Sequence, residues 1–293
     1  MTYNNASRVC IHHIWLASLF VLLSIYAPSA LAGGWEAGGH LKYSFSHSRY
    51  DTDNIFTQEG TPTPTDQTLN LRLTAETKSD SKWDAVIHYE VSAHHSDSIK
   101  TARSYAPLPA LAGYGQLNDD VRLSNLTWSI IDEGKNVLFH RLDRASVGYT
   151  ETSYVFRFGR QAVSWGNGMV FQPMDIFNPF SPAAVDKEYK TGDDMVYLQN
   201  LLGTGDDIQT VFIPRRDITT GNLEADESSL ALKYHTTHGA TDMDILVSRH
   251  FGDNLAGLGF AADWKGTVLR GDLVNAWNPN DSALSGAVSV NYS

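Results

Sequence analysis

Apolar and polar residues alternate along most of the chain after residue 34. The clearest stretch runs from 83 to 94, where every odd position is apolar and every even position except Val86 is polar. Strict alternation over this length predicts β-strands with one apolar and one polar face. Helical periodicity is hard to find anywhere in the same region. The pattern therefore indicates an all-β protein.

Thirteen segments carry this pattern or lie between clear turn signals. They cover residues 39–49, 68–77, 83–94, 121–131, 137–149, 154–164, 194–202, 208–216, 229–237, 243–250, 255–264, 267–277 and 285–293. The better ones run about nine to eleven residues, which is the length that crosses a bilayer with tilt. Strands of ordinary soluble proteins average about five to six residues.

The connections between these segments fall into two classes. Short polar turns are expected at 78–82, 132–136, 203–207, 238–241 and 252–254, and long polar loops at 51–67, 95–119 and 218–228. Outer-membrane β-barrels combine tight periplasmic turns with long extracellular loops. A soluble β-sandwich has no reason to segregate its loops in this way. The loop lengths therefore favour a transmembrane antiparallel β-barrel.

Aromatic residues near the segment ends agree with this interpretation. An interfacial girdle would be formed by Trp35, Trp83, Tyr89, Trp128, Tyr154, Trp264 and Trp277. Amphipathic aromatic rings favour the membrane–water interface, where one edge is apolar and the other meets headgroups. Each ring alone is an ordinary packing residue. Their placement beside turns, taken together, is what supports an interfacial girdle.

The N-terminus has the layout of a secretory signal peptide. Arg8 gives a positive start, residues 14–27 are apolar apart from two serines, and small residues precede Gly33. The stretch is too short for a stop-transfer helix, so we predict cleavage after Ala32. A buried N-terminal helix is the alternative. Cys10, the only cysteine, would leave with this peptide, and a cysteine-free exported chain favours a bacterial envelope protein.

Composition narrows the class further. The 293 residues carry a net charge of −11, and the mean hydropathy is −0.26 without a run of 18 apolar residues. These values exclude a helical membrane protein, a disulfide-stapled module and a basic nucleic-acid binder. A β-barrel is not excluded, because half of each strand faces water. We therefore expect a signal peptide at 1–32 and an outer-membrane barrel at 33–293.

The number of predicted strands raises a question about the end of the barrel. Single-chain bacterial barrels have an even number of strands, whereas this sequence gives thirteen. The chain also stops inside an alternating segment, with Tyr292 next to last. Either one strand is miscounted or the sequence lacks the last strands of a larger barrel. We favour the second explanation.

Residues 156–202 interrupt the alternation and contain the most distinctive motifs. Gly-Arg-Gln at 159–161 is followed by Trp-Gly-Asn-Gly at 165–168 and by Pro-Met-Asp-Ile-Phe-Asn-Pro-Phe-Ser-Pro at 173–182. These motifs resemble a family of proteobacterial outer-membrane barrels related to the alginate-export porins. Together with the signal pattern and the alternation, the resemblance covers essentially the whole mature chain. It implies a porin-like barrel and gives almost no information about the solute.

The same region predicts a constriction inside the barrel. Glycines and prolines forbid a long regular element at 165–193, so this stretch is a loop long enough to enter the lumen. Phe156 and Phe158 are expected on one face of their strand, and Arg157 and Gln161 on the lumen face. Simple alternation places Arg160 on the opposite face from Arg157.

Charged residues give this constriction its expected chemistry. The candidate pore-lining residues are Arg141, Arg144, Arg157, Arg160 and Gln161 on strands, and Asp175, Asp186, Lys187, Glu188, Lys190, Asp193 and Asp194 on the candidate loop. A basic wall opposite an acidic loop would set a transverse field that selects solutes. The alternative is that the arginines pair with the carboxylates and rigidify or plug the barrel.

Motifs for enzymatic or cofactor chemistry are missing from the sequence. It contains no Gly-x-Ser-x-Gly, phosphate-binding loop, His-Glu-x-x-His or paired-cysteine motif. The histidines lack metal-ligand spacing. We therefore expect no enzyme activity, no cofactor and no metal.

The function expected from the sequence is an outer-membrane channel for small hydrophilic solutes, anionic ones included. Its partners would be outer-membrane lipid, the solutes and the barrel assembly machinery, without nucleic acid. The alternative hypotheses are a transporter of hydrophobic compounds and, less favoured, a barrel enzyme. The oligomeric state is left open by the sequence.

Overall fold

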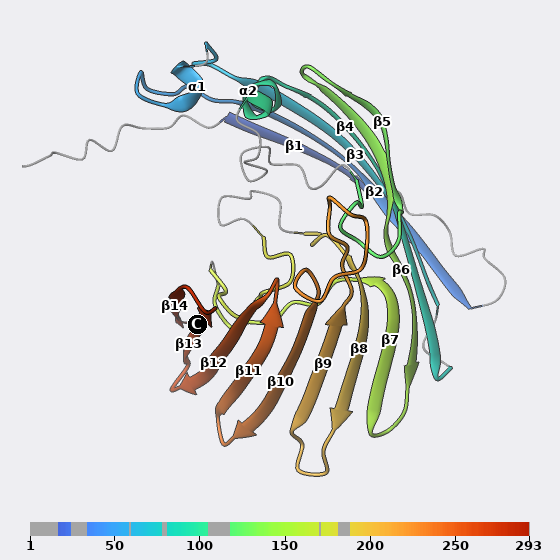
Figure 1. The fold of residues 1–293 in the computed structure, drawn as a ribbon, viewed down its shortest axis with the longest axis vertical. Coiled ribbons are helices and arrows are strands. Elements are labelled where there is room, and N and C mark those ends of the chain that lie inside the picture. The colour runs from blue at the N-terminus through green and yellow to red at the C-terminus, as the bar shows by residue number, and fades with distance from the viewer. Residues whose placement is uncertain are drawn as a thin grey trace, which may run out of the picture.

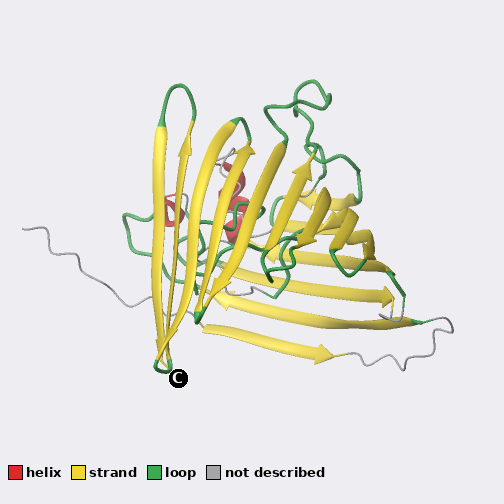
Figure 2. Cartoon of the chain, turned by 90° about the horizontal axis from the view of Figure 1, so that it is seen from below, coloured by secondary structure: helices red, strands yellow, loops and turns green. Residues whose placement is uncertain are grey.

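The computed structural model describes residues 17–24, 34–58, 60–77, 81–104, 118–169, 171–180 and 188–292. Strands make up 62% of the chain and helices 3%, so the fold is all-β, as the alternation predicts. Figure 2 shows the strands as nearly all of the regular structure, with two short helices beside them. These helices are α1 (Ile55–Gln58) and α2 (Asp97–Ser104).

The strands follow the chain in a simple up-and-down order. They are β1 (Ala17–Ser24), β2 (Trp35–His47), β3 (Thr65–Thr77), β4 (Trp83–Ser96), β5 (Thr127–Glu133), β6 (Asn136–Thr150), β7 (Tyr154–Gln161), β8 (Asp193–Leu201), β9 (Asp207–Ile213), β10 (Ser229–His238), β11 (Thr241–His250), β12 (Asp253–Trp264), β13 (Thr267–Trp277) and β14 (Ser282–Tyr292). Each of the thirteen predicted segments corresponds to one strand from β2 to β14.

All strands belong to one curved antiparallel sheet (Figure 1). Its order is β1-β2-β3-β4-β6-β7-β8-β9-β10-β11-β12-β13-β14, and β5 pairs with β6 beside this path. Among the described residues the edge strands β1 and β14 do not pair with each other, so the sheet curls without closing. The expectations of barrel closure and of further strands stay predictions.

Most strand boundaries differ from the sequence prediction by a few residues, and the differences at β5 and β7 lie beside the candidate site. The segment predicted at 121–131 begins as a strand only at Thr127, because Asp119 draws residues 119–126 into a turn: its carboxylate accepts the Leu126 N–H at 2.7 Å and its carbonyl accepts the Arg122 N–H at 2.8 Å. The segment predicted at 154–164 ends at Gln161, where the long loop begins.

Strand β1 lies inside the predicted signal peptide. Its backbone pairs with β2 from Ala17 opposite His47 to Ser24 opposite His40. The rest of the segment, 1–16 and 25–32, lies outside the described residues. Cleavage after Ala32 therefore stays a prediction.

The two ends of the sheet carry different connections, as the antiparallel pairings require. Between β2 and β14, one end, called the short-turn end, carries the connections 78–82, 151–153, 202–206, 239–240 and 265–266. The opposite end, the long-loop end, has the connections 48–64, 97–126, 162–192 and 214–228. The tight turns after β5, β11 and β13 also lie at this long-loop end. The predicted asymmetry of loop length is confirmed, although two of the predicted short turns, 132–136 and 252–254, belong to the long-loop side.

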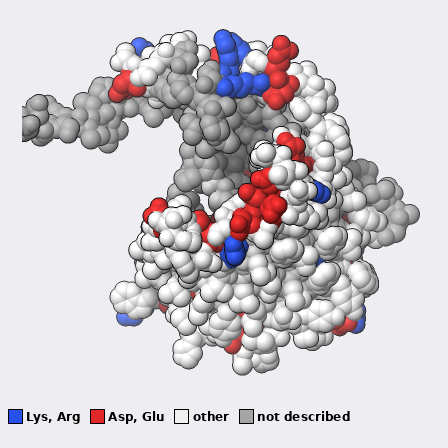
Figure 3. All heavy atoms as spheres, viewed as in Figure 1, with Lys and Arg blue, Asp and Glu red and all other residues white. Residues whose placement is uncertain are grey.

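The faces of the sheet show an inverted distribution of polarity. Large apolar side chains are exposed on the convex face, among them Leu69, Leu73, Ile87, Val147, Phe156, Phe158, Leu230, Leu232, Ile245, Val247, Leu258, Leu273, Val288 and Val290. Charged side chains are buried on the concave face, among them Arg72, Glu90, Arg141, Asp143, Lys233, Asp244 and Asp272. Soluble proteins bury apolar side chains and expose charged ones. Figure 3 shows acidic side chains gathered in a band on the inner side of the curve.

The largest apolar cluster lies between loop 162–192 and the concave face. The loop contributes Trp165, Met174, Ile176 and Phe177, and the strands contribute Met195, Val211, Ile213, Ala231, Leu246, Leu255 and Val274. A smaller cluster joins Ile99 of α2 to Val137 and Phe139 of β6. The loop therefore packs on the wall formed by β8 to β13 (Figure 1).

A glycine allows β7 to approach β6 closely. Gly159 has a φ of 118°, which side chains rarely adopt, and a Cβ at this position would overlap the carbonyl oxygen of Ala145. Phe156 and Phe158 face outward before it, and Arg160 after it is only 2% exposed beneath the loop before β5. The pairing of β7 continues through Arg160 and Gln161 without a register shift, so the expectation that Arg160 faces away from Arg157 stays a prediction.

This role of Gly159 can be tested by Gly159→Ala. We expect the free energy of unfolding to fall by about 2 kcal/mol or more, because alanine strains the backbone and meets Ala145. Urea unfolding of detergent-folded protein measures the change. Gly203→Ala is the matched control, since Gly203 lies in the β8–β9 turn with open space around it. Equal losses in the two variants would contradict this account.

Candidate functional site

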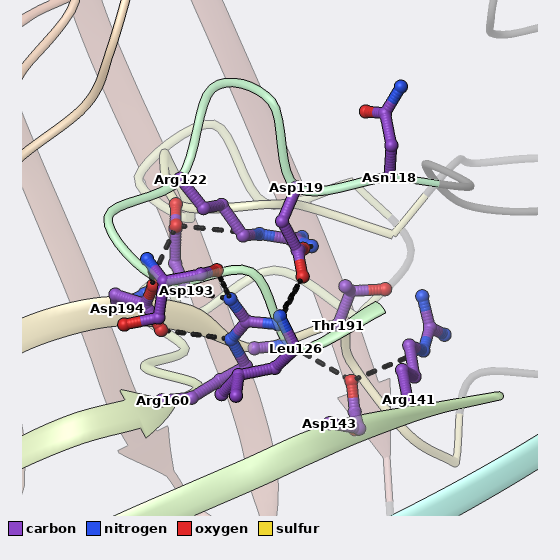
Figure 4. A network of polar contacts seen from close by, with 12 residues as sticks. Asn118, Asp119, Arg122, Leu126, Arg141, Asp143, Arg160, Thr191, Asp193 and Asp194 are labelled. Atoms are coloured by element: carbon purple, nitrogen blue, oxygen red, sulfur yellow. Dashed lines mark hydrogen bonds and ion pairs between the residues drawn. The ribbon is translucent and has the colours of Figure 1, made fainter. Parts of the chain in front are cut away.

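Arg160 is the centre of a buried ionic network at the long-loop end of β7 (Figure 4). Its Nε and Nη2 donate to the carboxylate of Asp194 at 2.9 and 3.2 Å, and its Nη1 donates to Asp119 at 3.0 Å. Nη2 also donates to the carbonyl oxygen of Ser124 at 2.7 Å. One guanidinium thus joins β7, β8 and the loop before β5.

The network continues through two more arginines. Arg122 donates to Asp119 at 2.5 Å, and its Nε lies 3.7 Å from Asp193. Arg215, from the loop after β9, donates to Asp193 at 2.7 Å and to Ser229 at 2.6 Å. Three arginines therefore face three carboxylates, and the charges balance. Such matching is required because an unpaired charge buried away from water is strongly destabilising.

Burial and charge oppose each other at Asp119. Burial by itself raises the pKa of Asp119, but hydrogen bonds and positive charge from Arg122 and Arg160 outweigh it, so the pKa lies below the ordinary value of 3.8. The carboxylate also accepts the Leu126 N–H at 2.7 Å. Asp119 is therefore held as an anion that fixes the loop against the sheet.

A second basic group lies on β3, β4 and β6. Arg72 donates to Asp143 at 2.8 Å and lies 3.4 Å from Glu90, while Arg141 donates to Glu90 at 2.6 Å. Arg144 also donates to Asp143 at 2.8 Å. Here three arginines share two carboxylates, so this group is more basic than the first.

A β-bulge explains how neighbouring residues of β6 reach the same group. The register between β4 and β6 shifts at His88 and Tyr89, which face Arg144 and Leu142, so Asp143 is the extra residue. Asp143 is 1% exposed and accepts the N–H of Gly192 at 3.3 Å from the end of the long loop. The bulge therefore places a carboxylate between the arginines and the loop.

The Trp-Gly-Asn-Gly motif attaches the long loop to the opposite wall. The backbone N–H of Asn167 donates to both carboxylate oxygens of Asp272 at 3.0 Å, and that of Gly168 donates to one of them at 3.3 Å. The Asn167 side chain donates to Asp244 at 3.0 Å. A Cβ at Gly166 would lie 3.0 Å from Asp272, so glycine permits this close approach.

The loop is also held by a buried pair within itself. Lys190 donates to Asp175 at 2.5 Å and to the carbonyl oxygen of Val163 at 2.7 Å. Burial raises the pKa of Asp175 and lowers that of Lys190, and the opposite charge of the partner works against both shifts. Trp165 completes the attachment by donating from Nε1 to Gln209 of β9 at 2.8 Å.

The structure brings most of the predicted residues to the concave face. Arg141, Arg144, Arg160, Asp175, Lys190, Asp193 and Asp194 lie in the ionic groups described above. Gln161 is buried beside them, and Glu188 is half exposed and paired with Lys42. Asp186 and Lys187 lie outside the described residues.

Arg157 differs from the other predicted arginines. It pairs in register with Gly148 and Tyr197, and Tyr197 packs against the apolar cluster on the concave face. Its side chain is 46% exposed, and its Nε lies 3.6 Å from Asp84. Arg157 therefore lies on the concave face, as predicted, with its charge open to solvent.

The expected arrangement of a basic wall opposite an acidic loop needs correction. Asp193 and Asp194 belong to β8 rather than to the loop, and the carboxylates that contact the arginines come mainly from the wall. The alternative from the sequence, in which arginines pair with carboxylates and make the interior rigid, describes these contacts better. A pore-lining role for the predicted residues stays a prediction.

Sequence reasoning missed several members of these groups. They are Arg72, Glu90, Asp119, Arg122, Asp143, Arg215, Asp244 and Asp272. The available signal was their strand pattern: Arg72 and Glu90 occupy polar positions of alternating segments, and so face the same side as the arginines of β6. Asp119, Arg122 and Arg215 lie in loops, where alternation gives no direction.

Two further observations concern membrane-spanning helices and metal ions. Within the part of the chain that the structure describes, neither helix is long or apolar enough to cross a membrane. Among those described residues, no three His, Cys, Asp or Glu side chains come together in a way that could hold a metal ion.

The central position of Arg160 predicts a large effect of Arg160→Met. Losing the guanidinium leaves Asp119 and Asp194 buried without this partner, and we expect the free energy of unfolding to fall by about 3–5 kcal/mol. Arg157→Met is the matched control, and we expect a loss of at most about 1 kcal/mol because Arg157 is exposed. Urea unfolding of both variants in the same detergent measures the difference. Similar stabilities would refute the central role.

Comparison with known proteins adds no family to this description. A scan against protein-family models gave no match, and a search of curated protein sequences gave no significant match. The resemblance to barrels related to the alginate-export porins therefore rests on the motif residues alone. Function has to be inferred from the inverted sheet, its charged inner face and its attached loop.

Proposed function

We propose that the protein is an outer-membrane β-barrel channel for small hydrophilic solutes, anionic ones included. The observation that carries this proposal is the inverted polarity of the sheet. Its convex face exposes rows of Leu, Ile, Val and Phe, and its concave face holds the charged groups. This arrangement is unfavourable in water and suits a strand wall between lipid and an aqueous interior.

The aromatic residues support the same orientation. Trp83 and Trp264 are 60% and 72% exposed at the short-turn end, while Trp128 and Trp277 are about 40% exposed toward the long-loop end. Trp128 and Val91 both pair with His140 of β6, so they lie at the same height in the sheet. From Trp83 to Val91 a rise of about 3.4 Å per residue gives roughly 27 Å, or roughly 20 Å across a bilayer at a tilt of about 40°. Barrels expose an apolar band of about 25 Å.

The concave face supports a preference for hydrophilic solutes. The group around Arg72, Arg141 and Arg144 has more arginines than carboxylates, although acidic side chains gather elsewhere on the inner side, and Arg157 is half exposed beside Asp84. Basic side chains inside a pore favour anions.

A second candidate function is the transport of hydrophobic compounds. One observation favours it: loop 162–192 lines the wall with an apolar cluster, and its Met169 and Phe171 are about half exposed. A plugged, apolar interior would carry no ion current, so conductance distinguishes the two candidates.

The lipid-facing surface is tested by Leu258→Lys. Leu258 lies in the middle of β12 with 58% of its surface exposed, and a lysine near the bilayer midplane costs about 2–4 kcal/mol. We expect the stability of protein folded into dilauroylphosphatidylcholine vesicles to fall by this amount. Ile218→Lys, at a 69% exposed loop position, is the matched control and should be neutral. If the convex face met water, both variants would be neutral.

The channel itself is tested in planar lipid bilayers. We expect stepwise ion currents, and we expect Arg157→Glu to shift the reversal potential in a KCl gradient toward cation preference. Arg249→Glu is the control, because Arg249 lies at the long-loop end of β11 on the face of Ile245 and Val247. Folded protein that inserts but carries no current would favour the second candidate.

A further inference from the structure

Tyr189, near the end of the long loop, occupies a socket on the first strands of the sheet. The socket consists of His40 and Lys42 on β2, Arg72 on β3 and His88 on β4, and we call it the Tyr189 socket. The Arg72 guanidinium carbon lies 4.2 Å from the Tyr189 ring centroid, and the His40 ring stacks on it at 5.2 Å. His88 meets the ring edge at 6.3 Å.

Lys42 gives the socket a second kind of contact. Its Nζ lies 5.8 Å from the Tyr189 ring centroid and forms an ion pair with the Glu188 carboxylate. Adjacent loop residues therefore present an aromatic ring to Arg72 and His40, and a carboxylate to Lys42. A cation over an aromatic face contributes about 0.5–2 kcal/mol, depending on its burial.

The socket contains buried polar atoms that no described residue hydrogen-bonds. Nε of Arg72 and Nδ1 of His88 are buried, and neither has a hydrogen-bond partner among the described residues. Arg72 is 3% exposed, and its two terminal nitrogens are directed to Asp143 and Glu90. Orphaned donors in a buried place usually indicate a partner such as water or a ligand.

From these contacts we propose that the Tyr189 socket is a binding site for aromatic carboxylates. Glu188 and Tyr189 fill the socket when no solute is bound. The ring of the solute replaces Tyr189 against Arg72 and His40, and its carboxylate replaces Glu188 on Lys42. This inference rests on the proposed function, because the solute reaches the concave face through the pore.

The test is calorimetric titration of the full chain, folded in detergent, with 4-hydroxyphenylacetate. We expect Tyr189→Ala to lower Kd about tenfold, because the resident competitor is removed. Glu188→Gln should also lower Kd. This variant replaces Tyr189→Ala if the latter fails to fold, because it alters only a half-exposed side chain. Lys42→Gln should raise Kd about tenfold by removing the charge that meets the carboxylate. Arg249→Gln, outside the socket, should leave Kd unchanged.

Two analogues separate the ring from the charge. We expect 2-(4-hydroxyphenyl)ethanol, without a carboxylate, and cyclohexylacetate, without an aromatic ring, to bind at least tenfold more weakly than 4-hydroxyphenylacetate. Equal binding of either analogue overturns the proposal, as does weaker binding by Tyr189→Ala or no binding by any variant. Conductance of the same samples is a separate readout: binding without current contradicts the channel, and current without binding contradicts the socket.

Discussion

The structure depends on one constraint, which is that the charged groups of the concave face must satisfy one another. An isolated charge buried in protein costs several kcal/mol, and opposite charges offset this only in good geometry. Arg160 meets the same requirement with four hydrogen bonds, two to Asp194 of β8 and two to Asp119 and Ser124 of the loop before β5. Loops that are far apart in sequence are consequently fixed to the wall by charge, and loop 162–192 also by its apolar cluster.

The same constraint explains the distinctive motif of the chain. Trp-Gly-Asn-Gly is a backbone arrangement that brings two N–H groups to the Asp272 carboxylate. Its glycines leave room for neighbouring atoms to approach the loop backbone closely. Its tryptophan joins the apolar cluster and donates a hydrogen bond to Gln209. The motif is therefore explained by attachment of the loop, without any chemistry of its own.

The strands could be predicted from the sequence because alternation reports directly on a two-faced wall. Residues such as Leu71 and Arg72 reveal their faces by their neighbours alone. The burial of Arg160 could not be predicted this way, because alternation gives the face of a residue and not the loop that covers it. The partners of the arginines were also hidden, since Asp119 and Arg215 come from loops whose path depends on the finished sheet. Closure of the barrel and the identity of the solute depend on groups that the alternation pattern does not describe.

The edge of β6 is shared between two strands, and this has a consequence for the order of folding. Residues 136–141 pair with β5 and residues 145–150 pair with β7, so neither strand runs the full height of the wall. The remaining height is completed by loops, with the N–H of Arg216 donating to the carbonyl oxygen of Val121 at 2.9 Å. Hairpins form from neighbouring residues, whereas this junction joins residues nearly a hundred positions apart. Contacts of such long range form slowly, so this part of the wall is expected to be completed after the hairpins on either side.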